Sequence, residues 1–400
     1  MFDHEDHREL AKRLDLFHFE EVAPGMVFWH PRGWAVYRRL EEIVRRRSQR
    51  ELFEEVRTPQ LLRRAVWEES GHWQHFKEGM FALLDGAEDA AVKPVSCPGH
   101  AHLVRRRAPG YRALPIRIFE LGLVHRDEPS GALQGLLRLR QFTQDDGHVF
   151  CRPEQAEAEL LRFLSGVAPF YQAFGFEKVR FALSLRPESR AGAEAAWDWA
   201  EGVLSKVLDG LGHGFSVQPG GGAFYGPKVE VVLSDRLGRE WQCGTIQLDV
   251  VPERFGLEYV EADGSRKPPV MLHQALFGSL ERFIAMVLEQ HGARLPAWLS
   301  PEAVVLLPIG PEAAGQVSRW AADLRDQGVA AAVDAREESL SRRIAEAHDR
   351  GVSEVWVVGP AELAAGMVSR RRAGASEVRP FAELAPELIE RCRPPAVVYG

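Results

Sequence analysis

A proline-punctuated segment at residues 294–302 divides the chain into two parts with different hydrophobic patterns. After this segment, apolar runs at 303–309, 329–333 and 355–359 alternate with helical patterns at 311–327 and 339–350. This βαβαβ alternation predicts a small parallel-sheet domain. The last hundred residues hold 12 basic and 15 acidic side chains and no lysine. Their net charge therefore does not mark a nucleic-acid-binding module.

The first part of the chain predicts a mixture of helices and antiparallel strands. Residues 34–56 have the pattern of an amphipathic helix, which runs into a short strand ended by Pro59. Apolar runs at 114–124 and 136–150 predict a hairpin, because polar turn formers at 126–132 lie between them. The other expected elements are helices at 153–174, 192–211 and 274–291, and strands at 178–185, 228–233 and 241–248.

Composition excludes several classes of protein. The chain has 400 residues, of which 45% are hydrophobic and 27% charged, as in ordinary globular proteins. Its net charge of −7 excludes a uniformly basic nucleic-acid coat. No apolar run reaches about 18 residues, so no membrane span is expected. The first residues contain no apolar core of a signal peptide, and the four cysteines form no CxxC pair, which together predict a reduced, cytoplasmic location.

Three separate segments carry residues that can bind a metal. The first is Lys93–His100 with Cys97, the second is Gln144–His148, and the third ends at His273. Each also has a simpler interpretation, namely a buried free cysteine, a solvated turn and a core histidine. Taken together, one cysteine and two histidines can form a three-ligand zinc site with an open position, which is the catalytic pattern.

Candidate anion-binding residues are arginines and one lysine in a glycine-rich segment. Arg126 precedes the hairpin loop, Arg138 follows it, and Arg282 lies in the helix predicted at 274–291. Guanidinium groups bind phosphates in a bidentate manner and stack on aromatic rings. Lys228 ends the segment that starts at Gly222, which is equally compatible with an ordinary glycine turn. No Walker A sequence is present, so any use of ATP would not involve a P-loop.

These segments occur in the order typical of class II aminoacyl-tRNA synthetases, and the chain most resembles the threonyl-tRNA synthetase family. The stretches that carry the resemblance are Ala23–His30, Trp67–Trp73, Cys97–His100, His125–Gly131, Phe142–His148, Ala223–Lys228, Gln242–Asp249 and Gly278–Phe283. They extend over residues 1–300 almost continuously. Over residues 301–400 the resemblance rests on the βαβ layout and on Asp334–Glu338.

The resemblance implies an α+β fold. A class II antiparallel sheet of six to seven strands, flanked by helices, would occupy residues 1–297, and a small α/β anticodon-binding domain would occupy residues 298–400. The helix and strand that end at Pro59 would form motif 1 and the interface of a homodimer. The implied ATP-binding residues are Arg126, Glu128, Arg138, Phe142, Lys228 and Arg282, of which Arg126, Lys228 and Arg282 would be catalytic.

The resemblance also implies a ligand set and a substrate. Cys97, His148 and His273 would hold one Zn²⁺ per subunit, with Mg²⁺ and ATP as further requirements. The threonine pocket would be formed by Gln144, Asp146, Tyr225, Gln242, Thr245 and Ser279. The implied activity is threonine–tRNA ligation, in which threonine is activated by ATP and transferred to threonine tRNA.

Several positions depart from the family pattern. Val95 and Ser96 precede the zinc cysteine in place of Met-Asn, Gly221 replaces an acidic residue, and Gln274 replaces an arginine. Ser339 and Ala345 stand where the family has cations in the C-terminal domain. The chain begins where the ubiquitin-like and editing domains of bacterial relatives would end, so mischarged serine would have to be removed in trans, by a separate editing protein, or tolerated. The alternatives are a threonine-activating paralogue that serves another acceptor or inhibitor tolerance, and a non-catalytic binding protein.

Overall fold

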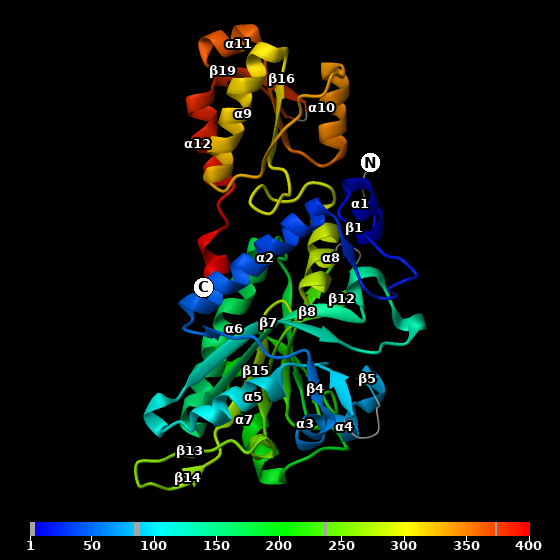
Figure 1. Cartoon of the computed structure of the whole chain (residues 1–400). Helices are drawn as coiled ribbons and strands as arrows, with labels where there is room; N and C mark the ends of the chain where they lie inside the picture. The colour runs from blue at the N-terminus through cyan, green and yellow to red at the C-terminus, as the bar shows by residue number, and fades with distance from the viewer. Residues whose placement is uncertain (1–4, 84–88, 236–237, 373) are drawn as a thin grey trace. The chain divides into compact units, whose positions relative to one another are not determined.

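The computed structural model describes residues 5–83, 89–235, 238–372 and 374–400 (Figure 1). Contacts divide the chain into two compact units, each assembled from separate stretches. The larger unit consists of Glu21–Met26, Glu41–Met286 and Val397–Gly400, and the smaller of Met1–Glu20, Val27–Leu40 and Val287–Ala396. No helix within the described ranges combines the length and the apolar character needed to cross a membrane.

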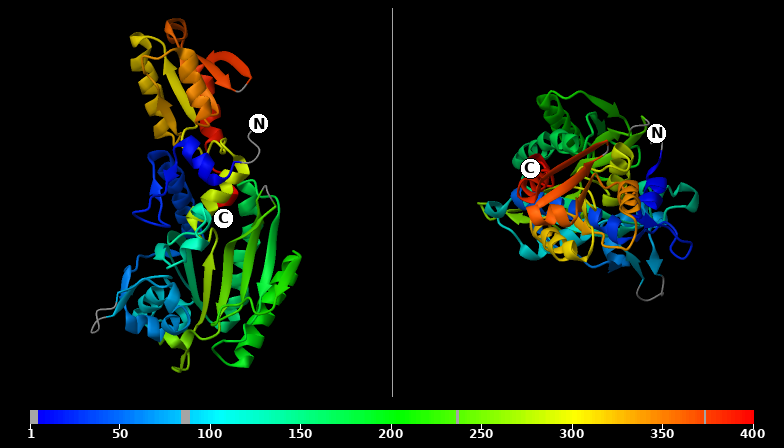
Figure 2. Two further views of the ribbon diagram at one scale, coloured as in Figure 1. Left: turned by 90° about the vertical axis from the view of Figure 1, so that its right-hand side faces the viewer. Right: turned by 90° about the horizontal axis from the view of Figure 1, so that it is seen from above.

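The larger unit is built on a sheet of eight strands. The left view of Figure 2 shows the green strands of this sheet side by side. In chain order they are β3 (Glu54–Glu55), β7 (Ile116–His125), β8 (Gln141–Cys151), β9 (Val179–Ser184), β10 (Phe215–Gln218), β11 (Lys228–Ser234), β12 (Glu240–Asp249) and β15 (Val270–Ala275). Across the sheet the order is β10–β9–β11–β12–β15–β8–β7–β3. The six central strands pair antiparallel, as expected, whereas β10 and β3 add parallel pairs at the edges.

Helices cover this sheet with apolar side chains. Helix α6 (Ala156–Ala173) contacts β12 and packs on α7 (Glu194–Leu211). Phe170 lies 5.3 Å from Phe277 between ring centroids, and these rings belong to a buried aromatic cluster. The other elements wholly within this unit are β4 (Leu61–Arg63), α3 (Arg64–Glu69), α4 (His72–His75), β5 (Ala82–Leu83), β6 (Ala90–Val92), α5 (Cys97–Arg107), β13 (Tyr259–Val260) and β14 (Arg266–Lys267). Helices α2 (Pro31–Arg50) and α8 (Leu280–His291) each contribute residues to both units.

Three predicted boundaries in this part of the chain were wrong. The helix predicted to 56 ends at Arg50, because Leu52 takes a positive φ of 62° before β3. The second hairpin strand begins at Gln141 instead of 136, since residues 135–137 form a 3₁₀ turn that buries Leu136 and Leu137. The helix predicted from 274 begins at Leu280, because the apolar residues up to Ala275 form a strand buried between β12 and β8.

The smaller unit contains a five-stranded sheet in the order β17–β16–β18–β19–β20. Strands β16 (Val304–Pro308), β17 (Ala331–Val333) and β18 (Glu354–Val358) are parallel, as predicted. The sequence reasoning missed β19 (Met367–Arg372) and β20 (Ala375–Pro380), which add an antiparallel edge. The other elements are α1 (His7–Leu14), β1 (Phe17–His18), β2 (Phe28–Trp29), α9 (Pro311–Asp326), α10 (Leu340–Asp349), α11 (Pro360–Ala365) and α12 (Phe381–Arg391).

Alternating side chains of this sheet enter two cores. Leu306 and Trp356 belong to one buried cluster, and Leu307 and Val357 belong to another. A strand directs successive side chains to opposite faces, so the continuous apolar runs predicted at 303–309 and 355–359 fit strands buried on both faces.

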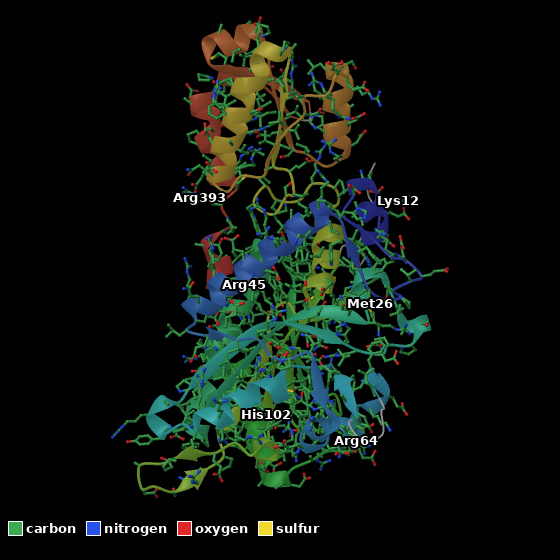
Figure 3. All side chains as sticks on the ribbon, viewed as in Figure 1. Lys12, Met26, Arg45, Arg64, His102 and Arg393 are labelled. Carbon is green, nitrogen blue, oxygen red and sulfur yellow. The ribbon has the colours of Figure 1, made fainter. Side chains whose placement is uncertain are left out.

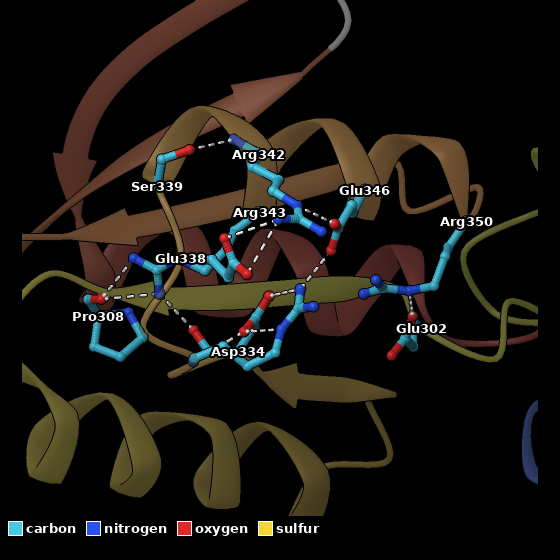
Figure 4. A network of polar contacts seen from close by, with 10 residues as sticks. Glu302, Pro308, Asp334, Glu338, Ser339, Arg342, Arg343, Glu346 and Arg350 are labelled. Atoms are coloured by element: carbon cyan, nitrogen blue, oxygen red, sulfur yellow. Dashed lines mark hydrogen bonds and ion pairs between the residues drawn. The ribbon is translucent and has the colours of Figure 1, made fainter.

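The N-terminus of α10 carries a network of polar contacts (Figure 4). The Ser339 hydroxyl accepts a hydrogen bond from the Arg342 backbone N–H at 3.4 Å, which caps the helix. Arg342 also forms ion pairs with Glu338 and Glu346. The Arg343 guanidinium is buried and donates to the carbonyl oxygens of Pro308 and Asp334. The arginines of this helix are therefore engaged within the unit itself.

A close backbone approach fixes the segment before β11. A Cβ built at Gly226 would lie 1.9 Å from the Leu248 carbonyl oxygen. Leu248 belongs to the central strand β12, whose backbone cannot shift without disturbing its pairing with the neighbouring strands. We expect Gly226→Ala to lower the free energy of unfolding by at least about 2 kcal/mol. Gly202→Ala, in α7 with nothing within 4 Å of the new methyl group, should instead stabilise by about 0.5–1 kcal/mol. Urea denaturation followed by tryptophan fluorescence measures both changes, and equal midpoints for the two variants would contradict this account.

Candidate active site

One face of the large sheet gathers most of the predicted site residues. Gln144, Asp146 and His148 alternate along β8, so their side chains point to the same face. His273 on β15 is the register partner of His148, and Gln247 on β12 is the partner of His273. Directly opposed side chains on antiparallel strands lie close together. This register brings together two histidines that are 125 positions apart in the chain.

Cys97 joins the two histidines from outside the sheet. It is the first residue of helix α5, and its thiol is buried. One ligand atom from each of Cys97, His148 and His273 lies within 4.8 Å of the others. The nitrogens that face each other are Nε2 of His148 and Nδ1 of His273, 2.9 Å apart. In the part of the chain that the structure describes, no other three histidine, cysteine or acidic side chains bring their ligand atoms this close together.

The chemistry of the three groups fits zinc. Burial lowers the pKa of His148 well below its ordinary value, which keeps the imidazole in the neutral form that binds metals. Burial also raises the pKa of the Cys97 thiol, so a cation beside the sulfur is needed to favour the thiolate. One thiolate and two imidazoles are the three-protein-ligand set of a catalytic zinc site.

A buried ion pair holds the second histidine. His273 Nε2 lies 3.0 Å from Asp249 Oδ2, and Asp249 forms a bidentate pair with Arg254 at 2.6 and 2.7 Å. Burial alone would raise the pKa of Asp249, but Arg254 and His273 lower it to about 2. The ionised carboxylate of Asp249 therefore accepts a hydrogen bond from the Nε2–H of His273. This leaves the lone pair of Nδ1 directed at the cluster.

The three groups line a cavity of about 470 Å³. Asp146 lies beside them, accepts a hydrogen bond from the Ser96 backbone N–H at 3.2 Å, and has a pKa raised by burial to about 6. The predicted residues in this cavity are Cys97, Arg126, Gln144, Asp146, His148, Tyr225, Lys228, Gln242, Thr245 and His273. Lys228, predicted to bind ATP, thus lies with the threonine-pocket residues, and it pairs with Glu230 at 2.5 Å.

A second cavity of about 330 Å³ adjoins the first, since Arg126 and Gln242 line both. The predicted residues found here are Arg126, Glu128, Arg138, Phe142, Gln242, Ser279 and Arg282. Ser279, predicted to contact threonine, therefore lies in the cavity of the ATP residues, and its hydroxyl accepts from the Arg282 backbone N–H at 3.2 Å. The structure places every predicted site residue in one or both cavities.

The arginines of the second cavity are held in fixed orientations. The Arg126 guanidinium lies 5.1 Å from the centroid of the Phe142 ring, and its Nε donates to the Pro94 carbonyl. Arg282 donates to the carbonyl oxygens of Leu137 and Gln242, at 3.1 and 2.9 Å. Glu128 and Arg138 pair with each other at 2.8 Å. This cavity thus presents positive charge beside an aromatic ring.

Sequence reasoning did not assign several residues that line these cavities. His72, buried and with its Nε2 4.0 Å from the Cys97 sulfur, has a pKa lowered to about 3 by burial. It belongs to the stretch Trp67–Trp73, which carried the resemblance but received no role. The other unassigned lining residues include His75, Phe76, Phe224, Trp241 and Gln247. Of the departures from the family pattern, Val95 and Gln274 line the first cavity.

Comparison with known families agrees with this architecture. Residues 81–291 match the model of the tRNA synthetase class II core domain (G, H, P, S and T). Residues 303–391 match the model of an anticodon-binding domain.

Individual relatives are similar over most of the chain. The threonine–tRNA ligase of Cupriavidus pinatubonensis (strain JMP 134 / LMG 1197) is 48% identical over 370 residues, or 92% of this chain and 58% of that protein. The chain thus spans a little over half the length of this curated relative. A crystal structure of the RNA-binding domain of threonyl-tRNA synthetase from Cryptosporidium parvum Iowa II has a TM-score of 0.93 and 36% identity, covering 98% of this chain and 100% of that one.

A more distant structure shares the fold. A putative threonyl-tRNA synthetase from Aeropyrum pernix has a TM-score of 0.77 at 24% identity, and covers 98% of each chain. The matched class II core contains every residue that lines the two cavities except His72, His75 and Phe76. The second matched domain corresponds to the parallel-sheet region predicted after residue 302. The chain therefore belongs to the class II aminoacyl-tRNA synthetases and, within them, to the threonyl-tRNA synthetase family.

Proposed function

We propose that the chain is a threonine–tRNA ligase. In the first step the threonine carboxylate attacks the α-phosphate of ATP, which forms threonyl-adenylate and releases pyrophosphate. In the second step a ribose hydroxyl at the 3′ end of threonine tRNA attacks the adenylate, which releases AMP. The observation that supports this proposal best is the pair of adjoining cavities, one with a thiol and two imidazoles and the other with arginines beside an aromatic ring.

The arginines would serve the phosphates and the adenine. Arg126 lines both cavities, so we assign it to the α-phosphate and the threonine carboxylate. Phe142 and Arg282 would enclose the adenine, Glu128 would accept from its amino group, and Arg138 would bind the γ-phosphate. Lys228, which lines the first cavity, would also contact ATP, and Mg²⁺ would accompany the phosphates. Such a site accelerates the reaction by orienting the reactants and by stabilising the charge that develops on the phosphate.

Cys97, His148 and His273 would hold the zinc ion that the resemblance implies. When bound, zinc supplies a Lewis acid with open positions for an amino group and a hydroxyl. Asp146 would accept from the substrate amine and hydroxyl, while Gln144, Tyr225, Gln242, Thr245 and Ser279 would complete the pocket. A polar site of this kind rejects an isostere without the hydroxyl, such as valine, by about 10⁴–10⁵.

Further partners are part of the proposal. The matched anticodon-binding domain supports threonine tRNA as the acceptor. The domain division at residues 297 and 298, the homodimer through the motif 1 region, a separate editing protein and the cytoplasmic location stay predictions from the sequence.

One assay tests the activation step. We expect threonine-dependent exchange of pyrophosphate into ATP in the zinc-loaded protein, weak exchange with serine and very little with valine. Serine differs from threonine by one methyl group, which is worth only about 1–3 kcal/mol. A strong chelator should abolish the exchange, and added Zn²⁺ should restore it. Absence of threonine-dependent exchange in zinc-replete protein would refute the proposal.

A second candidate function keeps activation but changes the acceptor. Ser339 and Ala345 replace family cations, and Arg342 and Arg343 are engaged within their own unit. These observations favour a paralogue that activates threonine for another acceptor. Exchange with threonine, but no transfer to threonine tRNA, would support this alternative over the ligase.

A further inference from the structure

His100 is a buried histidine that has no role in the proposed reaction. It lies on α5 three residues after Cys97, so both side chains lie on the same face of the helix. The side chain is fully buried, and its ring stands perpendicular to that of His148 with centroids 4.7 Å apart. The two Nδ1 atoms of His100 and His148 are 2.7 Å apart, which is a hydrogen-bond distance.

This contact couples the proton positions of the two rings. His148 Nε2 faces the cluster, so it can bind a metal only if the ring proton is on Nδ1. The Nδ1–H of His148 must then donate to Nδ1 of His100, which requires the His100 proton to be on Nε2. The opposite arrangement, with a proton on Nδ1 of His100, would force the His148 proton onto Nε2 and block the ligand atom.

A buried carboxylate favours the first arrangement. Glu120 Oε1 lies 3.9 Å from Nε2 of His100, and this nitrogen makes no hydrogen bond to the described part of the chain. Glu120 accepts from the Thr58 backbone N–H and hydroxyl, at 2.7 and 2.9 Å, and pairs with the buried Lys93. A carboxylate fixed in this way attracts the positive end of the N–H dipole, so the His100 proton is favoured on Nε2.

The sequence of the helix N-terminus fits this arrangement. A Cβ at Gly99 would lie 2.8 Å from the Thr58 side chain, the same residue that holds Glu120. Glycine therefore permits α5 to approach the carboxylate closely enough for His100 to lie between it and His148. Pro98 suits the first turn, where its missing N–H has no helical partner.

We propose that His100, with Glu120 behind it, is a positioning residue that sets the tautomer of His148, so that Nε2 is the metal-binding atom. The inference rests on the proposed zinc site. The two histidine ligands are then oriented in different ways. Asp249 contacts His273 directly, whereas Glu120 acts on His148 through the imidazole of His100. The motif Cys97-Pro-Gly-His100 thus supplies one ligand and the support of another from a single helical turn.

Three variants separate this role from general packing. His100→Leu removes the acceptor, whereas His100→Asn places a carboxamide oxygen where Nδ1 accepted. His102→Leu is the matched control, because His102 is an exposed histidine on the same helix (Figure 3). Zinc affinity is measured by competition with a chromophoric chelator, and the geometry of the site by the visible spectrum of the Co²⁺-substituted protein.

We expect His100→Leu to weaken zinc binding by about 10- to 100-fold and to change the Co²⁺ spectrum. His100→Asn should recover most of the affinity, and His102→Leu should match the wild type. In the zinc-loaded wild type, the ¹⁵N spectrum of His148 should show a protonated Nδ1 and a metal-bound Nε2, a measurement that does not depend on the folding of any variant. Equal zinc affinity for His100→Leu and wild type, or a proton on Nε2 of His148, would overturn the inference. A wild type that binds no zinc would instead refute the proposed metal site.

Discussion

Arg126→Ala is expected to lower threonine-dependent ATP–pyrophosphate exchange by about 10³- to 10⁵-fold, the range known for arginines that stabilise a phosphoryl-transfer transition state. The expectation follows from its position, since Arg126 lines both cavities and is held against Phe142. No other predicted arginine lines both cavities. The loss should appear mainly in kcat, because the guanidinium would interact most strongly with the charge that develops on the α-phosphate.

Two further variants test whether this loss is specific to the guanidinium group of Arg126. Arg126→Lys keeps the charge but loses the planar, bidentate fork, so an intermediate loss is expected. Arg106→Ala, an exposed arginine on α5 that lines neither cavity, should leave the exchange unchanged. If Arg126→Ala retained exchange within about tenfold of the wild type, the assignment of Arg126 to the α-phosphate would be wrong.

Cys97→Ala is expected to abolish selection for the threonine hydroxyl together with high-affinity zinc binding. Without the thiolate, two imidazoles remain, and the pocket has to distinguish threonine from valine largely by shape. A pocket that relies on shape alone cannot strongly distinguish such isosteres, so the preference for threonine should fall far below the ratio of about 10⁴–10⁵ of a site that binds the hydroxyl. The measurement is the ratio of kcat/KM for threonine over valine in exchange, alongside the zinc content. Threonine exchange itself should fall strongly.

Cys151→Ala provides the control for this prediction. Cys151 is also a buried cysteine of the larger unit, at the end of β8, but it does not line the cavity. This variant should keep one zinc per chain and the wild-type preference for threonine. Unchanged discrimination in zinc-free Cys97→Ala protein would show that Asp146 and its neighbours recognise the hydroxyl without the metal.

Local patterns in the sequence predicted much of the fold. The parallel strands of the smaller unit were predicted because each is a short apolar run between helical patterns. The strand Val270–Ala275 was partly assigned to a helix, because a short apolar run buried on both faces has no period that separates strand from helix. Strands β19 and β20 were missed since polar side chains interrupt their apolar pattern, at four of six positions in β19 and three of six in β20.

The candidate site was predictable only in part. Spacing allowed Cys97, His148 and His273 to form a three-ligand zinc site but did not favour this over their simpler interpretations, because sheet register and the approach of α5 bring them together. The resemblance supplied the connection. The resemblance did not predict which residues orient these ligands, however. Asp249 and His100 do so through contacts between segments far apart in the chain. Such contacts leave no periodic signal in one sequence.

The smaller unit is assembled from three separate stretches of the chain, which limits how a recombinant fragment of it can be made. Arg32 donates to the carbonyl oxygens of Leu14 and Arg350, both at 2.8 Å, and pairs with Glu302. A recombinant fragment that began at residue 298 would lack Arg32 and would leave Glu302 and the Arg350 carbonyl without this donor. An independently folding version of the anticodon-binding region would need the N-terminal stretches Met1–Glu20 and Val27–Leu40 joined to it through a designed linker.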